Sequence, residues 1–394
     1  MYNHKNIETS IEILGNLVQY PVLGGESNTS IAGYITDYLK KNKISYSTVP
    51  NEKGDKMSIH CRIGPNADGG IILSGHTDVV PTEGQPWTKP DFEITRSNGR
   101  LYSRGTTDMK GFLACCLTMV PHLKKIPLSK PVYLAFSYDE EVGCLAGPTL
   151  IKHIKETYEE KPRFAIIGEP TSMKTIIAEK GVAFFKTQVY GQAAHSSQVR
   201  RSVSAIEEAT YLTQWLLNKM DGFIAEGNID NRFDPSYTTI HIGKIKGGTA
   251  VNIVADYCEF YWDVRNIPSD SIEKIERSFQ EFCLERIREK KKSFPAFNII
   301  TTAEFPIVPG LDTPKTDEVV KLVNSFTGKE SFETVAFASE AGQFSKEGFS
   351  AVLCGPGSME QGHKADEYIE ITEMNKCLHF LDELVSWCKN DKIK

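Results

Sequence analysis

The chain has 394 residues, more than one hydrophobic core usually supports, which predicts two domains. Its composition of 40% hydrophobic and 24% charged residues is typical of a globular protein. The net charge of -6 and the lack of a basic block interleaved with aromatic residues argue against a nucleic-acid-binding protein.

The first part of the chain alternates helix-like and strand-like segments. Residues 10–20 and 29–42 place apolar side chains at helical spacing, whereas residues 69–75, 131–138 and 163–169 are short apolar runs of strand length. This alternation predicts an α/β fold with a mostly parallel central sheet flanked by helices.

A second unit of different pattern follows. Its expected order is a strand at 182–191, a helix from about Ser204, strands at 237–245 and 254–264, a helix from about Asp270, and a strand at 296–303. Ser204 and Asp270 each precede a glutamate by three residues, a pattern typical of helix starts.

This βαββαβ order predicts an α+β domain inserted into the first. After it the pattern returns to a helix at 316–326, a strand at 350–357 and a final helix at 372–388. We therefore expect one domain from residues 1–181 and 305–394 and an inserted domain from residues 182–304.

Several metal-capable side chains follow the predicted strands or lie in nearby turns. Ligands of open α/β sheets collect beyond the carboxyl ends of the strands. Alone, each of these residues is more often part of a hydrated turn or a helix start than of a site. The set consists of His76, Asp78, Asp108, Glu140, Glu141, Glu169 and His363.

Taken together, these imidazoles and carboxylates suit two divalent metal ions. Zinc accepts nitrogen and oxygen ligands, and one carboxylate can bridge two ions about 3.5–4 Å apart. Glu140 and Glu141 are adjacent as they leave a strand, so one can bind metal while the other acts as a general base. His76 and Asp78 lie two apart and share one face of an extended segment.

The segments that hold these residues resemble a known family. They read GHTDVVP, DMKG, DEE, GEPTS, GQAAHSS and GPGSMEQGHKADEYIE in chain order. The set is similar to the motifs of the di-zinc amidohydrolase and peptidase family that includes aminoacylase, succinyl-diaminopimelate desuccinylase and acetylornithine deacetylase. Gly362 and Ala365 depart from that pattern, but neither departure removes a functional side chain.

The resemblance implies a role for each matched residue of the first domain. Asp108 would bridge two zinc ions, which cobalt can replace, and the Asp108-Met109 peptide is expected to be cis. His76 and Glu169 would complete one metal site, and Glu141 and His363 the other. Asp78 would orient the ring of His76, and Glu140 would be the general base.

For the inserted domain, the resemblance implies a lid and a dimer contact. His195 would reach the active site of the partner subunit and stabilise the oxyanion, although a histidine in this position is as often structural. Asn252 and Arg265 would hold the substrate carboxylate, and a surface ion pair is the alternative for Arg265. Glu340 is predicted either to bind the ammonium group of the substrate or to cap a helix that starts near Ala341.

The expected reaction is removal of the acetyl group from N2-acetyl-L-ornithine, which gives L-ornithine and acetate for arginine biosynthesis. The alternatives are a deacylase acting on another N-acyl amino acid or on succinyl-diaminopimelate, a dipeptidase, and an inactive binding protein of the same fold. We expect a cytoplasmic homodimer with a small-molecule substrate and no membrane partner. The start MYNHKNIETS lacks the apolar core of a signal peptide, and the nine cysteines form no C-x-x-C pair.

Overall fold

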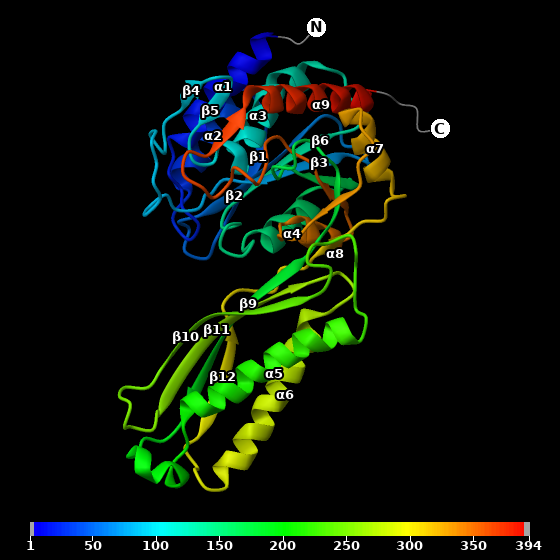
Figure 1. Ribbon diagram of the computed structural model, residues 1–394. Coiled ribbons are helices and arrows are strands. Elements are labelled where there is room, and N and C mark those ends of the chain that lie inside the picture. The colour runs from blue at the N-terminus through cyan, green and yellow to red at the C-terminus, as the bar shows by residue number, and fades with distance from the viewer. Residues whose placement is uncertain (1–3, 390–394) are drawn as a thin grey trace. The chain divides into compact units, whose positions relative to one another are not determined.

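Figure 1 shows the computed structural model of the protein, which describes residues 4–389. The chain divides into two compact units. Unit 1 consists of Met1–Ala178, Leu311–Thr334 and Ser339–Lys394, and unit 2 consists of Glu179–Gly310 and Val335–Ala338. Within the described residues, no helix has both the length and the apolar character needed to span a membrane.

A nine-stranded sheet forms the centre of unit 1. Its neighbouring strands β6, β3, β7 and β15 are parallel, as predicted, while the strands that flank these four pair with them antiparallel. All of the residues of β3, β6 and β7 are buried, because both faces of the sheet are covered. The nine strands are β1 (Tyr46–Pro50), β2 (Met57–Ile63), β3 (Ile71–His76), β6 (Val132–Ser137), β7 (Phe164–Ile167), β8 (Ile176–Glu179), β13 (Leu311–Asp312), β14 (Glu333–Val335) and β15 (Ser350–Leu353).

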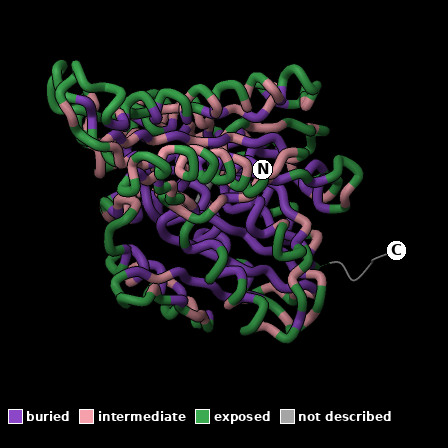
Figure 2. Tube along the Cα trace, turned by 90° about the horizontal axis from the view of Figure 1, so that it is seen from below, coloured by how far each residue is buried: buried purple, intermediate pink, exposed green. Residues whose placement is uncertain are grey.

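Helices cover the two faces of this sheet (Figure 1). One layer contains α1, α3 and α9, whose side chains Leu14, Leu113 and Leu381 join the main hydrophobic core, and α4 and α8 lie on the other face. Figure 2 shows that buried residues fill the interior of the molecule. The helices of unit 1 are α1 (His4–Val18), α2 (Thr29–Lys41), α3 (Gly111–Lys125), α4 (Gly147–Thr157), α7 (Glu318–Thr327), α8 (Ala341–Lys346) and α9 (Ile371–Lys389).

A small three-stranded sheet also belongs to unit 1. Strand β5 (Arg100–Tyr102) lies between β4 (Thr95–Ser97) and β16 (Tyr368–Glu370). The pairing of β5 with β16 brings the chain after His363 next to the segment that leads to Asp108.

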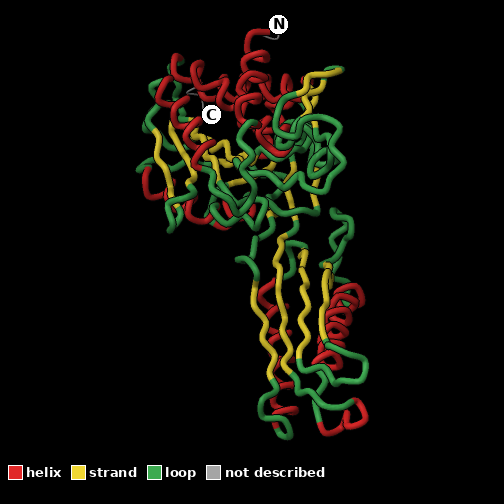
Figure 3. The backbone as a smooth tube through the Cα atoms, turned by 90° about the vertical axis from the view of Figure 1, so that its left-hand side faces the viewer, coloured by secondary structure: helices red, strands yellow, loops and turns green. Residues whose placement is uncertain are grey.

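Unit 2 is a four-stranded antiparallel sheet with two long helices packed against it (Figure 3). Its strand order is β10-β11-β9-β12, and its chain order is the βαββαβ that the sequence predicts. In β11, buried and half-buried residues alternate, so that Phe260 and Trp262 pack in the core of the unit. The elements are β9 (Gly181–Tyr190), η2 (Ser196–Arg201), α5 (Ala205–Ala225), β10 (Thr239–Gly247), β11 (Tyr257–Asn266), α6 (Ile272–Lys291) and β12 (Asn298–Ala303).

The two predicted helix starts of unit 2 differ in outcome. Helix α5 begins after Ser204, whose hydroxyl accepts from the amide of Glu207, as predicted. Helix α6 begins one residue later than the prediction, because Ser271 and not Asp270 is the N-cap residue. The carboxylate of Asp270 accepts a hydrogen bond from Thr238 instead, which occupies it outside the helix.

Candidate metal centre and active site

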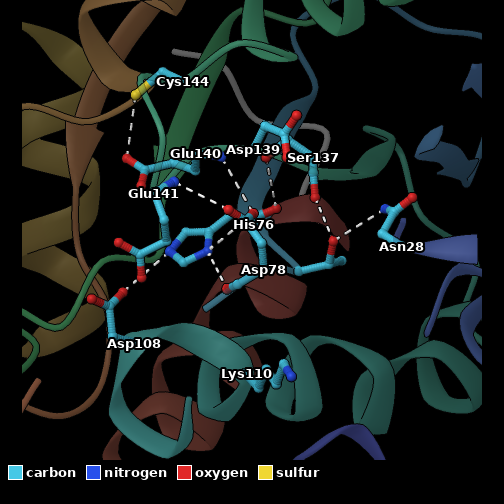
Figure 4. A network of polar contacts seen from close by, with 12 residues as sticks. Asn28, His76, Asp78, Asp108, Lys110, Ser137, Asp139, Glu140, Glu141 and Cys144 are labelled. Atoms are coloured by element: carbon cyan, nitrogen blue, oxygen red, sulfur yellow. Dashed lines mark hydrogen bonds and ion pairs between the residues drawn. The ribbon is translucent and has the colours of Figure 1, made fainter. Parts of the chain in front are cut away.

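Three neighbouring parallel strands deliver the first residues of the site, and Figure 4 shows His76, Glu140 and Glu141 among them. His76 is the last residue of β3, Glu140 and Glu141 follow β6, and Glu169 follows β7. Because the carboxyl ends of parallel strands meet at one edge of a sheet, residues far apart in sequence converge there. His76 and Glu169 are buried.

Asp108 lies in the turn that precedes α3, and its peptide bond to Met109 is cis, as predicted. Two glycines let this turn lie against the strand ends. A Cβ atom at Gly75 would lie 2.6 Å from the Met109 side chain, and one at Gly168 would lie 2.1 Å from the ring of Phe112. Since real Cβ atoms do not approach other atoms so closely, larger residues at the two positions would force Met109 or Phe112, which flank the turn of Asp108 and α3, to shift.

Asp108 is the shared member of two groups of possible metal ligands. The first group joins it with His76 and Glu169, and the second with Glu141 and His363; within each group the ligand atoms lie within 4.8 Å of one another. His76 Nε2 is 3.1 Å from Asp108 Oδ1, and His363 Nε2 is 3.1 Å from Asp108 Oδ2. His363 Nε2 is also 3.1 Å from Glu141 Oε2.

This donor set fits two divalent ions such as zinc. Ligand atoms about 2.0–2.2 Å from a tetrahedral zinc are about 3.3–3.6 Å from each other, close to the 3.1 Å separations found here. The two oxygens of Asp108 face different histidines, which is the arrangement that a bridging carboxylate needs. The structure therefore brings together all five residues that the sequence predicts as ligands.

The electrostatics of the site show a shortage of positive charge. Hydrogen bonds to Asp108 and Glu141 raise the pKa of His363 to about 10. Burial and then the neighbouring carboxylates, Glu169 first among them, raise the pKa of Glu140 well above its usual range. Divalent cations would offset the negative charge of these crowded carboxylates, which otherwise favours protonated imidazoles. The pKa shifts therefore support the assignment of the same residues as metal ligands.

Asp78 contacts both the ring of His76 and the turn of the two glutamates. The ring Nδ1 of His76 lies 2.9 Å from the backbone carbonyl of Asp78, whereas the nearest carboxylate oxygen is 3.7 Å away. The carboxylate instead accepts the backbone N–H groups of Glu140 at 3.3 Å and Glu141 at 3.1 Å. Asp78 therefore touches the histidine through its backbone and holds the turn of both glutamates through its side chain.

Two residues that the sequence does not single out support Asp108. Glu367 accepts the backbone N–H groups of Thr107 at 2.9 Å and Asp108 at 3.2 Å. Its other oxygen lies 2.7 Å from Arg104 Nη1, and both side chains of this ion pair are only 1% exposed. Glu367 is close to His363 in sequence, which is a local signal, but Arg104 has none.

Lys56 and Asp139 form a second buried pair in the same region. Lys56 Nζ lies 2.6 Å from Asp139 Oδ2, and the other oxygen accepts the amide of Gly25 at 2.8 Å. Asp139 directly precedes Glu140, so this pair ties the start of the glutamate turn to the segment before β2. The sequence places Asp139 at a strand end, but its ion pair cannot be read from it.

Glu340 immediately precedes α8, and its side chain makes no capping hydrogen bond. It is 1% exposed, and Ser74 Oγ lies 3.5 Å from its Oε2. Burial raises the pKa of its carboxyl to about 7, although a hydrogen bond from Ser137 lowers it. The capping role is therefore not observed, and the substrate role stays a prediction.

The remaining predicted residues lie in unit 2. His195 is exposed, and its Nδ1 accepts the amide of Ser197 at 3.2 Å. The carbonyl of Asn252 accepts the amide of Ser196 at 3.0 Å, which places Asn252 next to His195. Arg265 lies on β11, where its Nε is 3.5 Å from Asp263 Oδ1, so the surface ion pair expected as its alternative role is present.

Comparison with known protein families matches residues 72–387 to peptidase family M20/M25/M40. Among curated proteins, the acetylornithine deacetylase of Photorhabdus laumondii is 30% identical over 383 residues, which cover 95% of this chain and 96% of that protein. The acetylornithine deacetylase of Shigella sonnei is 32% identical over 368 residues, which cover 91% and 92% of the two chains.

Solved structures share the fold. An M20 family metallo-carboxypeptidase from Sulfolobus solfataricus superposes with a TM-score of 0.75 at 18% identity, covering 95% of this chain and 98% of that one. A dinuclear metal-binding peptidase of the M20 family from Bacillus subtilis has a TM-score of 0.65 at 13% identity, with 98% and 99% covered. At such identities the likeness shows the fold alone.

Proposed function

The chain belongs to peptidase family M20/M25/M40 and is an amide hydrolase of that family; from this premise we propose that it is a di-zinc deacetylase that cleaves N2-acetyl-L-ornithine to L-ornithine and acetate. The observation that carries the chemistry is Asp108, whose two oxygens face the two histidines of the site. The names of the relatives at 30% and 32% identity support the choice of substrate.

His76, Asp108 and Glu169 would hold one ion, and Asp108, Glu141 and His363 the other. When bound, such a pair of ions lowers the pKa of a water molecule and polarises the acyl carbonyl. Glu140 accepts a proton from the attacking water and passes it to the leaving amine. Asp78 holds the backbone of Glu140 and Glu141, so that the base and the ligand keep different directions.

The preference for a cationic substrate is assigned to Glu340. Its Oε1 is buried and has no hydrogen-bond partner among the described residues, and an ammonium group is a partner that would satisfy it. Asn252 and Arg265 are proposed to bind the substrate carboxylate. His195 is proposed to stabilise the oxyanion in the active site of a partner subunit, which makes the protein a homodimer.

The alternatives keep the fold and change the substrate or remove the chemistry. A deacylase for succinyl-diaminopimelate or another N-acyl amino acid, or a dipeptidase, would use the same ligands and the same base. An inactive binding protein would be expected to have lost Glu140 or a metal ligand. All of these residues are present, so an enzyme is the better-supported reading.

The test is a comparison of substrates at saturating zinc and at saturating cobalt. We expect kcat/KM to be highest for N2-acetyl-L-ornithine in a panel with succinyl-diaminopimelate, acetyl-methionine and simple dipeptides. In Glu340→Gln, kcat/KM should fall about tenfold or more for acetylornithine and little for acetyl-methionine, since a hydrogen bond to a charged group contributes about 1.5–3 kcal/mol. A higher kcat/KM of the wild type for any other substrate would contradict the proposed function. Equal losses of kcat/KM on both substrates in Glu340→Gln would show that Glu340 does not recognise the ammonium group.

A further inference from the structure

A buried thiol lies against the carboxylate of Glu140. The side chain of Cys144 is 4% exposed, and its Sγ lies 3.3 Å from Glu140 Oε1 (Figure 4). The thiol is the donor and Glu140 Oε1 is the acceptor. The contact is therefore an S–H···O hydrogen bond to one oxygen of the proposed general base.

The backbone between the two residues makes this contact rigid. The carbonyl of Glu140 accepts the amide of Gly143 at 3.0 Å and that of Cys144 at 2.9 Å. The carbonyl of Cys144 in turn accepts Gln343 Nε2 at 3.0 Å. With its own amide bound to Asp78, Glu140 is held at its N–H, its carbonyl and its carboxylate.

The conformation of Cys144 is one that favours glycine. Its φ of 52° lies in the left-handed region, where a Cβ atom causes strain that a glycine avoids. The preceding residue is already a glycine, Gly143, with a φ of 111°. Cys144 therefore carries a side chain at a position where a glycine would avoid the strain, and that side chain contacts Glu140.

We propose that Cys144 is a positioning residue for Glu140, an inference that rests on the proposed function. Its S–H bond fixes the orientation of the carboxylate and occupies Oε1, which leaves Oε2 to accept the proton from water. A hydroxyl at the same position can donate a bond of the same kind, which makes serine the conservative replacement.

Kinetics of the zinc-loaded enzyme test the proposal with three variants. Cys144→Ala removes the donor, Cys144→Ser restores one, and Cys116→Ala removes a thiol that is 1% exposed in the core on α3. In Cys144→Ala we expect kcat to fall about 2–10-fold at unchanged KM, the range given by the loss of one hydrogen bond.

Cys144→Ser should recover most of kcat, and Cys116→Ala should match the wild type in kcat and KM. A purely structural role for Cys144 would lower the stability of Cys144→Ala and leave the kcat of its folded fraction unchanged. A wild-type kcat in Cys144→Ala, or no recovery in Cys144→Ser, would overturn the proposal.

A second measurement does not depend on activity. An infrared difference spectrum between the wild type and Cys144→Ala isolates the S–H stretching band of Cys144. The other eight of the nine thiols are present in both proteins, so their bands cancel. We expect this band at a lower frequency than the bands of the other thiols. In Glu140→Gln the band should shift to a higher frequency, because an amide oxygen is a weaker acceptor than a carboxylate oxygen. If the wild type is active and the band has the same frequency in Glu140→Gln, the inference is overturned. A responsive band in a protein that hydrolyses none of the panel refutes the proposed function alone.

Discussion

Replacing Arg104 by methionine should destabilise unit 1 strongly. The guanidinium of Arg104 pairs with Glu367 at 2.7 Å, with both side chains 1% exposed. It also donates to Gln85 Oε1 at 2.6 Å and to the carbonyl of Pro81 at 3.2 Å. Methionine keeps much of the length of the side chain and removes its charge and its donors.

The magnitude follows from the burial of the pair. Removing one partner of a buried ion pair leaves an uncompensated charge, which costs about 3–5 kcal/mol. The matched control is Arg96→Met, because Arg96 pairs with Glu8 at 2.9 Å on the surface, where the side chains are 51% and 59% exposed. An exposed pair contributes about 0–1 kcal/mol.

The assay is urea unfolding of metal-free protein, followed by tryptophan fluorescence. Trp87 lies 5.1 Å from the Arg104 guanidinium and reports on this region directly. The double variant Arg104→Met/Glu367→Met should recover part of the lost stability, since it removes the buried carboxylate as well. Equal losses in Arg104→Met and Arg96→Met, or no recovery in the double variant, would refute the argument that a buried charge is compensated here.

Three further outcomes are expected. Glu140→Gln should keep its metal and lose about 10²–10⁴-fold in kcat, whereas Glu141→Gln should bind metal more weakly. Metal analysis and kinetics on the same samples check both variants. The reverse result would exchange the roles of the two glutamates. Mixing inactive His195→Ala with inactive Glu140→Gln should restore activity, because a mixed dimer holds one intact site; no recovery after verified subunit exchange would contradict a histidine from the partner. Burial and then the neighbouring His153 lower the pKa of His60 from 6.5 to about 4, so its contribution to stability is present above about pH 6.5 and lost as the pH falls to about 4. Between about pH 7.5 and about pH 5 this group should cost about 2 kcal/mol of unfolding free energy, a loss that His60→Gln should not show in urea titrations at the two pH values.

The α/β class and the location of the metal ligands can be predicted from sequence because both have local signals. Strand β3 opens with the apolar run 71–73 and ends in His76, and a sheet covered on both faces favours such apolar runs. A residue at the end of a parallel strand can be assigned to the ligand-binding edge without knowledge of the rest of the chain. No local signal predicts the position of Asp108. Its assignment as a ligand depends on the family resemblance, and its place in the structure depends on two distant glycines that let its turn approach the strand ends.

The supporting contacts could not be predicted, for physical reasons. Arg104 and Glu367 are 263 residues apart, and nothing near Arg104 distinguishes it from a surface arginine. Asp78 shares a face with His76 in an extended segment, but the chain turns there, so its carbonyl meets the ring and its carboxylate meets the glutamate turn. The start of α6 differs by one residue because Thr238 binds Asp270, a contact from another strand end.

Return of zinc to the metal-free protein tests the central claim most directly. Protein treated with a chelator should lose the hydrolysis of N2-acetyl-L-ornithine, and activity should return with added zinc to reach its maximum at about two ions per chain. Bound zinc and initial rate are measured on the same samples. Full activity in protein shown to contain no metal would contradict the account.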